Sequence, residues 1–337
     1  MKYSIIIATY NRIDELQELF ESIDRLDIDT HIYEIVIADD GSQDGTGRFI
    51  QSLHKPYSIQ YLYQENKGPG AARNLAMDHA KGEYFIFIDS DVLLPRNYLS
   101  KIEDFLSKHE VDAFGGPDDS HPSFPDFLKA VNYSMTSFLG TGGTRGSKKS
   151  LTRFYPRSFN MGIHRRVYQK IGGMSALRHG QDMDYSARIY NAGFRVALIP
   201  EAKVYHKRRT SLWRFFKQIF NWGVARVNLG RAYPEMLRFV HIMPAIIVVC
   251  GAIIIVLAPF FLIPYALLLI GLVMAVLVAL TAFIQSFLIY RSLSVSLLSV
   301  VTLFTQVFAY GLGLISGGVQ ILIGRENATG ITKNYYR

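Results

Sequence analysis

Hydrophobic and polar positions divide the chain into two parts of different character. Up to about residue 206, short apolar runs alternate with segments in which apolar residues recur every three or four positions. This pattern predicts strands alternating with helices. From Ile242 to Tyr290 there is no charged residue, and from Ser292 to Gly324 there is again none. We therefore expect an α/β domain followed by helices that span a membrane.

The run from Glu83 to Asp91 gives the clearest strand. Its centre, Phe85 to Ile88, has no polar alternation, which indicates burial on both faces, as in a parallel sheet. The run ends in Asp89 and Asp91, and α/β sheets bind ligands at the carboxyl ends of their strands. Two carboxylates without a basic neighbour offer the hard oxygen ligands that divalent cations prefer. A turn or a helix cap is the other explanation of this acidic pair.

Three more strands are expected before it, near residues 3–9, 33–38 and 59–63. The second of them ends in Asp39-Asp40-Gly41-Ser42, and the third leads to a glycine-bearing loop, 66–74, that passes into a helix. Either motif alone could be a plain turn, but their order after successive strands favours a ligand site at one edge of a sheet. A dinucleotide-binding dehydrogenase is disfavoured because no Gly-x-Gly-x-x-Gly follows the first strand.

As an ordered set, these motifs resemble family 2 glycosyltransferases with the GT-A fold. The resemblance is carried by Ser4 to Asn11, Ile35 to Ser42, Asn66 to Asn74 and Asp89-Ser90-Asp91, and it spans roughly the first 205 residues. It implies a Rossmann-like domain that binds a nucleotide-sugar, with a UDP-sugar as the first expectation. It also implies an inverting transfer that uses Mg²⁺ or Mn²⁺.

The resemblance further implies roles for individual residues. Donor contacts are expected from Ala8, Thr9, Tyr10, Asn11, Asp40, Lys67, Arg73, Asp89 and Ser90. Metal ligands are expected from Asp91, Asp89 and His206, although a histidine beside three basic residues could equally be a surface residue. Asn160 and Trp222 are candidate contacts for the acceptor.

A separate motif supplies the expected catalytic base. Gln181-Asp182-Met183-Asp184 opens a helix and resembles the acidic motif of the family, whose central Asp is the general base. The base therefore maps onto Asp182, while Gln181 stands where the family usually has Glu. Helix capping by Asp182 is the alternative.

Residues 117–150 show no clear period. Residues 117–122 are rich in turn formers, and 141–150 has the composition of a loop that is either disordered or closes as a lid over the donor.

The segment from Lys207 to Arg238 interleaves eight Lys or Arg residues and one acid with aromatic residues. This composition predicts a helix in the plane of an anionic membrane surface, and a basic flank that obeys the positive-inside rule is the alternative. The uncharged stretch that follows is too long for one span, and Pro259 and Pro264 divide it. Spans are expected near 240–258, 265–289 and 296–323. Three spans would place the tail on the far side of the membrane, although its basic residues argue against this.

The expected organisation is a GT-A catalytic domain at 1–206, an interfacial segment at 207–239, transmembrane helices at 240–324 and a tail at 325–337. The single cysteine, Cys250, excludes an intrachain disulfide and fits a cytoplasmic catalytic domain on a multi-pass protein of the inner membrane. The net charge of +8 suits an anionic membrane or a phosphate-bearing substrate. Nucleic acid is not an expected partner, because the sequence has no recognised nucleic-acid motif.

These features together favour an inverting glycosyltransferase that moves a sugar to a lipid-linked acceptor in surface glycan or glycolipid synthesis. A polyprenyl-phosphate sugar synthase is an alternative within the enzymes. A processive polysaccharide synthase is disfavoured, because Asn221 replaces the arginine of a Gln-x-x-Arg-Trp motif at Gln218–Trp222 and the membrane helices are too few. From another class, an inactive relative could act as a scaffold in a glycan-assembly complex.

Overall fold

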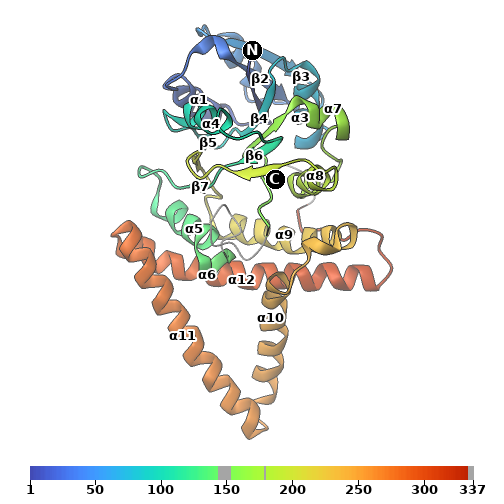
Figure 1. The fold of residues 1–337 in the computed structure, drawn as a ribbon. Helices are drawn as coiled ribbons and strands as arrows, with labels where there is room; N and C mark the ends of the chain where they lie inside the picture. The colour runs from blue at the N-terminus through green and yellow to red at the C-terminus, as the bar shows by residue number, and fades with distance from the viewer. Residues whose placement is uncertain (143–152, 178–179, 333–337) are drawn as a thin grey trace. The chain divides into compact units, whose positions relative to one another are not determined.

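The computed structural model of the chain describes residues 1–142, 153–177 and 180–332. It divides into two compact units, Met1–His121 with Thr144–Lys207 and Pro122–Gly143 with Arg208–Lys333. Each unit buries hydrophobic clusters of its own, so the two are described in turn (Figure 1).

The first unit is built on a mixed sheet with the strand order β3-β2-β1-β4-β8-β6-β9. Its strands are β1 (Tyr3–Thr9), β2 (Tyr33–Asp39), β3 (Ser58–Tyr63), β4 (Tyr84–Asp89), β6 (Ala113–Gly115), β8 (Asn160–His164) and β9 (Val196–Leu198). The strands β1 to β4 are parallel, and β8 runs antiparallel between β4 and β6. The register pairs Thr9 with Asp39 and Ala8 with Asp89, so three neighbouring strands end level with one another. The expected α/β sheet is confirmed.

Helices cover both faces of this sheet. On one face lie α1 (Ile13–Ile23) and α4 (Tyr98–Leu106), and on the other lie α3 (Pro69–His79), α7 (Arg165–Ile171) and α8 (Gln181–Asn191). Two short helices, α2 (Thr46–Gln51) and the 3₁₀ helix η1 (Thr30–Ile32), lie in the connections. Within β4, Ile86 and Ile88 belong to the first core, whereas Phe85 and Phe87 belong to the second. Burial on both faces explains why this strand is apolar without alternation.

A second, smaller sheet of the first unit has the strand order β5-β10-β7. Its strands are β5 (Val92–Leu93), β7 (Asp118–Asp119) and β10 (Val204–His206). The middle strand, β10, pairs antiparallel with β5 and parallel with β7. Strands of two residues leave no periodic signal, so β5 and β7 have no counterpart among the expected elements.

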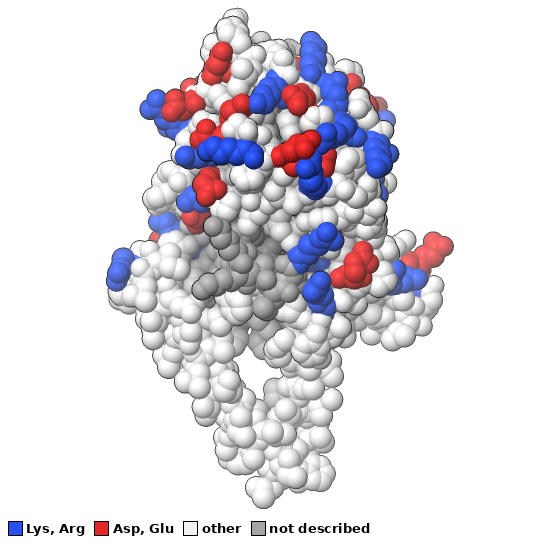
Figure 2. Space-filling model, viewed as in Figure 1, with Lys and Arg blue, Asp and Glu red and all other residues white. Residues whose placement is uncertain are grey.

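Among the residues that the structure describes there, the second unit contains helices and connecting loops but no strand. Its helices are α5 (Asp126–Thr136), α6 (Phe138–Thr141), α9 (Leu212–Ala232), the 3₁₀ helix η2 (Pro234–Met236), α10 (Phe239–Leu257), α11 (Leu262–Tyr290) and α12 (Leu293–Leu322). The last three are long and apolar enough to cross a membrane, which identifies a membrane protein. Charged side chains cover the visible face of the first unit, whereas the α10–α11 hairpin carries none (Figure 2).

The segment 117–150, which shows no clear period in the sequence, contains β7, α5 and α6 in its described part. Helix α5 was not predicted from the sequence, because it buries Asn132 and Ser134 along with its apolar residues. Polar residues on the buried face interrupt the apolar period by which a helix is recognised. Nearly all of the loop expected at 141–150 lies outside the described residues.

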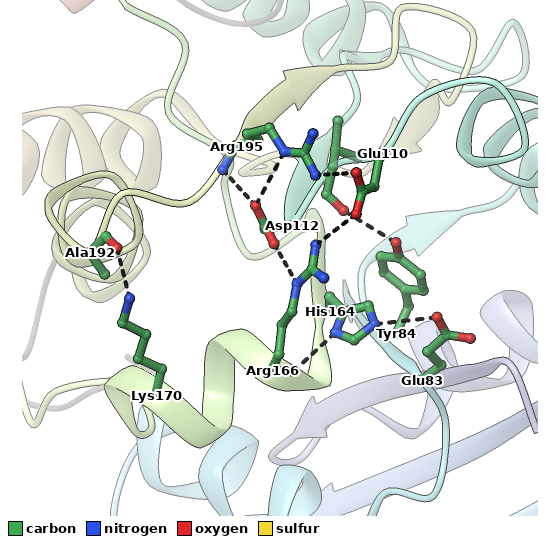
Figure 3. Close-up of polar contacts among 10 residues, drawn as sticks. Glu83, Tyr84, Glu110, Asp112, His164, Arg166, Lys170, Ala192 and Arg195 are labelled. Atoms are coloured by element: carbon green, nitrogen blue, oxygen red, sulfur yellow. Dashed lines mark hydrogen bonds and ion pairs between the residues drawn. The ribbon is translucent and has the colours of Figure 1, made fainter.

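A charged cluster joins β6, β8 and β9 at the end of the sheet where β4 begins (Figure 3). The buried carboxylate of Asp112 accepts hydrogen bonds from Nε of Arg166 at 2.6 Å and from the backbone N–H of Arg195 at 2.7 Å. The exposed carboxylate of Glu110 pairs with the Arg195 guanidinium at 2.7 Å. The cluster therefore anchors the edge of the sheet far from the acidic end of β4.

Replacing Asp112 by Ala should lower the free energy of unfolding by about 2–3 kcal/mol, because the Arg166 guanidinium and the backbone N–H of Arg195 both lose a buried acceptor. Thermal unfolding of the purified protein in detergent measures this as a lower melting temperature. Glu110→Ala is the matched control and should leave the melting temperature almost unchanged, since its carboxylate is exposed to solvent. Equal losses from the two variants would contradict the distinction.

Candidate active site

Two loops at the carboxyl ends of β1 and β2 are clamped together. The backbone N–H of Asn11 donates to Oγ of Ser42 at 2.8 Å, and Oδ1 of Asn11 accepts from the backbone N–H of Gln43 at 2.7 Å. Asn11 adopts a left-handed backbone with φ of 49°, a conformation that asparagine tolerates better than most residues. The clamp fixes the loop that follows Thr9, where donor contacts were expected.

Asp40 organises the loop that leads into α3. Its carboxylate is buried and accepts hydrogen bonds from the backbone N–H groups of Lys67 and Gly68, each at 2.8 Å, and from Nε2 of Gln64 at 2.6 Å. Gly68 has φ of 95°, which favours glycine, and Pro69 follows at the first turn of the helix. Asp40 therefore fixes the shape of this loop, and the Lys67 side chain remains exposed.

Arg73 lies on α3 and contacts the end of β4. Its Nη2 atom is 2.6 Å from Oδ1 of Asp89, and the arginine itself is buried. The expected donor residues Arg73 and Asp89 are thus brought together as an ion pair.

The small sheet places His206 beside Asp91. Asp91 immediately precedes β5, and the register of β5 with β10 pairs Val92 with His206. The His206 Nε2 atom lies 3.2 Å from Oδ1 of Asp91. Ligand atoms of Asp89, Asp91 and His206 all lie within 4.8 Å of one another, so the three expected metal ligands form one cluster.

Asp118 stands behind His206 and was not expected at the site. Its side chain is 0% exposed, and Oδ2 lies 3.5 Å from Nδ1 of His206. A carboxylate this close to one ring nitrogen favours, through its charge, a proton on that nitrogen, which leaves the other nitrogen for a metal ion. The only hint in the sequence is an acidic pair, Asp118-Asp119, within a segment that was interpreted as turns.

Arg12 is a second residue that sequence reasoning missed. Its Nη1 atom lies 3.1 Å from Oδ2 of Asp91. Burial alone would lower the pKa of this guanidinium, but the negative charges of Asp91, Glu15 and Asp89 raise its pKa above the ordinary value. Arg12 therefore stays charged and offsets the charge of the acidic cluster.

Asp182 lies in the first turn of α8. Its side chain is half-buried, and its only hydrogen-bond partner among the described residues is the backbone N–H of Met183, at 2.9 Å. The neighbouring Gln181 packs against Gly70, where a Cβ atom would stand 2.6 Å from its Nε2. The start of α8 and the start of α3 are thus adjacent.

Asp184 has a different environment from Asp182. It pairs with Nε of Arg188 at 3.1 Å, and Arg188 also donates to the carbonyl groups of Ile171 and Gly173. This carboxylate is therefore engaged in holding the turn after α7.

The two expected acceptor contacts lie in different units. Asn160 is 1% exposed; its Oδ1 accepts from the hydroxyl of Tyr98 at 2.7 Å, and its Nδ2 donates to the carbonyl of Ala202 at 2.7 Å. In this structure the Asn160 side chain is hydrogen-bonded at both its oxygen and its nitrogen and is not exposed to an acceptor. Trp222 lies in the second unit, partly buried against a cluster that includes Phe215 and Ile219.

The chemistry of the acidic cluster fits a divalent cation. Two carboxylates supply hard oxygen atoms, and His206 supplies a nitrogen, while the Asp118 carboxylate lies 3.5 Å from its other ring nitrogen. Mg²⁺ takes oxygen ligands and keeps several waters, and Mn²⁺ accepts carboxylate and imidazole ligands. Asp89, Asp91 and His206 therefore form a possible metal site.

Comparison with protein families matches residues 4–312 of the chain to two glycosyl transferase families. The description "Glycosyl transferase family 2" matches residues 4–172, and "Glycosyl transferase family 21" matches residues 135–312. The first match contains all four motifs at the carboxyl ends of the strands, and the second contains α9, α10 and α11.

Among curated proteins, the chain is similar to an uncharacterized glycosyltransferase of Rickettsia felis, with 42% identity over 114 residues. It is also similar to the poly(ribitol-phosphate) beta-N-acetylglucosaminyltransferase TarS of Staphylococcus aureus, with 32% identity over 114 residues. These alignments cover 34% and 33% of this chain but only 18% and 20% of those relatives. The glycosyltransferase AglE of Haloferax volcanii is 24% identical over 240 residues, which are 68% of this chain and 77% of AglE.

Among solved structures, the mannosyltransferase PcManGT from Pyrobaculum calidifontis, determined with GDP-Man and Mn²⁺, matches with a TM-score of 0.66 at 18% identity. The match covers 96% of this chain and 88% of PcManGT. The GT-A-like architecture followed by long apolar helices is therefore confirmed for nearly the whole chain.

Metal binding provides the direct test of the acidic cluster. Asp91→Asn should abolish Mn²⁺ binding measured by electron paramagnetic resonance, because the ligand loses its charge but keeps its shape. Asp118→Asn should weaken binding by about 10–100-fold, since it removes only the partner that orients His206. Asp119→Asn is the control; its carboxylate pairs with Lys203 at 3.1 Å, and binding should persist. Unchanged Mn²⁺ affinity in Asp91→Asn would remove the site.

Proposed function

The chain belongs to glycosyl transferase family 2, and on that premise we propose that it transfers a sugar from a nucleotide-sugar to a lipid-linked acceptor with inversion at the anomeric carbon. The observation that carries the proposal is the convergence of Asp89, Asp91 and His206 within 4.8 Å at the end of β4. The transfer would serve the synthesis of a surface glycan or glycolipid, on the cytoplasmic face of the inner membrane.

The donor would bind across the carboxyl ends of β1, β2 and β4. The nucleoside would contact the loop around Ala8 to Asn11, which the Ser42 clamp fixes. The diphosphate would lie near the start of α3, where backbone N–H groups and the helix dipole favour negative charge, with Lys67 beside it. A UDP-sugar is the proposed donor. Because PcManGT was determined with GDP-Man, a GDP-sugar is the donor to compare with it in assays.

Asp91, Asp89 and His206 would hold Mg²⁺ or Mn²⁺ at this position. When bound, such an ion offsets the charge that grows on the departing diphosphate. Among the chain's own groups, Asp118 would favour a proton on Nδ1 of His206, so that Nε2 could bind the ion, and Arg73 would hold Asp89 in place.

In the chemical step, the acceptor oxygen forms a bond to the anomeric carbon while the bond from that carbon to the diphosphate breaks. The acceptor hydroxyl is a weak nucleophile, so its proton must leave as the new bond forms. Asp182 would take this proton. Its half-exposed carboxylate is consistent with that role, and Gln181 beside it adds no second negative charge.

The alternative functions differ in whether the acceptor needs a catalytic base. A polyprenyl phosphate presents an oxygen that is already ionised, so a polyprenyl-phosphate sugar synthase would not need Asp182 as a base. Processive synthesis gains no support at Asn221, whose side chain binds the backbone N–H of Ile331 at 3.0 Å and the hydroxyl of Thr332 at 2.5 Å. An inactive scaffold would release no nucleotide at all.

Nucleotide release from UDP-sugars, with and without purified lipid acceptors, separates these possibilities. Release that requires a lipid with a free sugar hydroxyl and stops on addition of a chelator would support the proposal. Release that requires only polyprenyl phosphate would favour the synthase. The absence of release from UDP-sugars and GDP-sugars alike, under conditions in which nucleotide binds, would contradict transferase activity.

Replacing Asp182 by Asn should lower turnover by roughly 10²–10⁴-fold, because the variant keeps its shape but cannot accept a proton. The affinity for the donor should stay nearly unchanged, since the lost interaction is made only in the transition state. Single-turnover kinetics and donor titration measure the two effects separately.

Asp184→Asn is the matched control on the same helix turn. It breaks the ion pair with Arg188 and should lower the melting temperature more than the turnover of the folded enzyme. Near-normal turnover in Asp182→Asn with a hydroxyl acceptor would mean that another group is the base.

A further inference from the structure

Helix α12 differs from the other two long apolar helices in how it is packed. Within its most apolar stretch, 39% of the residues are buried inside the protein, against 6% in both α10 and α11. Its buried residues include five polar or small ones at helical spacing, Ser296, Ser299, Thr302, Gln306 and Gly313. Length and composition alone admit α12 as a membrane span, but its packing sets it apart from the other two helices.

The buried face of α12 contacts helices that are not membrane spans. The hydroxyl of Thr302 donates to the carbonyl of Ala130 in α5 at 3.0 Å, and Nε2 of Gln306 donates to the carbonyl of Gly140 in α6 at 2.6 Å. Helix α5 begins with a charged residue, Asp126. Thr302 and Gln306 of α12 thus each donate a hydrogen bond to a short helix that is not a candidate membrane span.

Over its second half, α12 packs along α9. A Cβ atom on Gly313 would stand 2.1 Å from the carbonyl oxygen of Phe220, and one on Gly317 would stand 3.3 Å from Cα of Val224. From the first contact to the second, the residue number rises by four in α12 and by four in α9. The two helices therefore run parallel, in close backbone contact. Whatever direction α12 takes relative to a membrane, α9 therefore shares it.

Helix α9 is unsuited to the interior of a bilayer. It carries four basic residues and no acid, namely Arg214, Lys217, Arg226 and Arg231. Each charged side chain at the centre of a bilayer is costly, whereas basic and aromatic residues together suit the headgroup region. Because α9 cannot cross, the parallel α12 does not cross beside it.

The hairpin of α10 and α11 meets α12 only near the hairpin's open end. Gly311 lies against the carbonyl of Pro244, close to the start of α10, and Oγ of Ser299 lies 2.7 Å from Oγ of Ser286, close to the end of α11. Beyond these points most large apolar residues of the hairpin are exposed. Figure 1 shows α12 lying across the mouth of the hairpin rather than alongside its helices.

The segment after α12 turns back along α9. Asn228 exchanges two hydrogen bonds with the backbone of Ala328, both at 2.9 Å, and Nη1 of Arg231 donates to the carbonyl of Glu326 at 2.6 Å. Nearer the start of α9, Oδ1 of Asn221 accepts from the backbone N–H of Ile331 at 3.0 Å. Residues 326–332 therefore run antiparallel to α9 and stay at the depth of that helix.

We infer that α9 and α12 lie side by side in the plane of a membrane surface and that only the α10–α11 hairpin enters the bilayer. The lipid-facing surface of α12 is a stripe of exposed apolar residues at helical spacing: Leu293, Leu297, Val301, Phe308, Leu312 and Val319. The partner of this surface is a bilayer with anionic headgroups, which the basic residues of α9 complement. The segment 325–332 consequently stays on the side of the catalytic unit, to which α9 is joined through Lys207 and Arg208.

Side-specific labelling tests the topology in the full-length protein. In a Cys250→Ala background, a cysteine is introduced either at Asn327 in the returning segment or at Gln51 in the catalytic unit, both of which are exposed. A membrane-impermeant maleimide is applied to spheroplasts and to inverted membrane vesicles. The inference requires both cysteines to react in the same preparation. Reaction of the two from opposite sides would mean that α12 crosses.

Depth measurements along α12 provide an independent readout. Spin labels at positions 297, 308 and 319 occupy the exposed stripe at its start, middle and end, and their collision with oxygen and with a polar nickel complex reports depth in liposomes. An in-plane helix gives the same depth at all three positions. A spanning helix places 308 deepest and the other two near opposite surfaces, and that pattern would overturn the inference.

Discussion

Three short strands hold the acidic end of β4 against a histidine that comes more than a hundred residues later. Pairing of β10 with β5 sets His206 next to Asp91, and pairing of β10 with β7 sets Asp118 behind it. The large sheet brings the carboxyl ends of β1, β2 and β4 level, but it supplies only the carboxylates. Without the small sheet the cluster would lack both its histidine nitrogen and the carboxylate beside that histidine, so the candidate site depends on these few backbone hydrogen bonds.

The sequence predicts the large sheet well because its strands are buried on both faces. Continuous apolar runs such as Phe85 to Ile88 leave little alternative to a parallel strand, and the polar residues that end them mark the binding edge. The small sheet is invisible to such reasoning, since strands of two residues carry no period. Asp118 and Arg12 were missed because only tertiary contacts reveal their neighbours. Arg12 lies beside Asp91, and Asp118 lies beside His206.

The roles of individual residues are harder to predict than the fold. A sequence motif shows which residue types are present, but it does not show whether their side chains are buried. Asp40 and Asn160 stand in positions that suggested ligand contact, yet both are buried and hydrogen-bonded to their own protein. They shape the site through the loop before α3 and through the packing of Tyr98. In the membrane half, length and hydropathy admit all three long helices as spans, although α12 is the least apolar of them. The packing of α12 against α5, α6 and α9 then separates it from the other two.

The central claim is that Asp89, Asp91 and His206 form one divalent-cation site that serves a nucleotide-sugar. Anomalous X-ray scattering from crystals grown with Mn²⁺ and UDP tests this most directly, because it locates the ion without assumptions about its ligands. The account predicts a single manganese peak in contact with Asp91 and His206 and with the diphosphate oxygens of UDP. Nucleotide bound at the carboxyl ends of the strands with no manganese there, or manganese bound elsewhere, would contradict it.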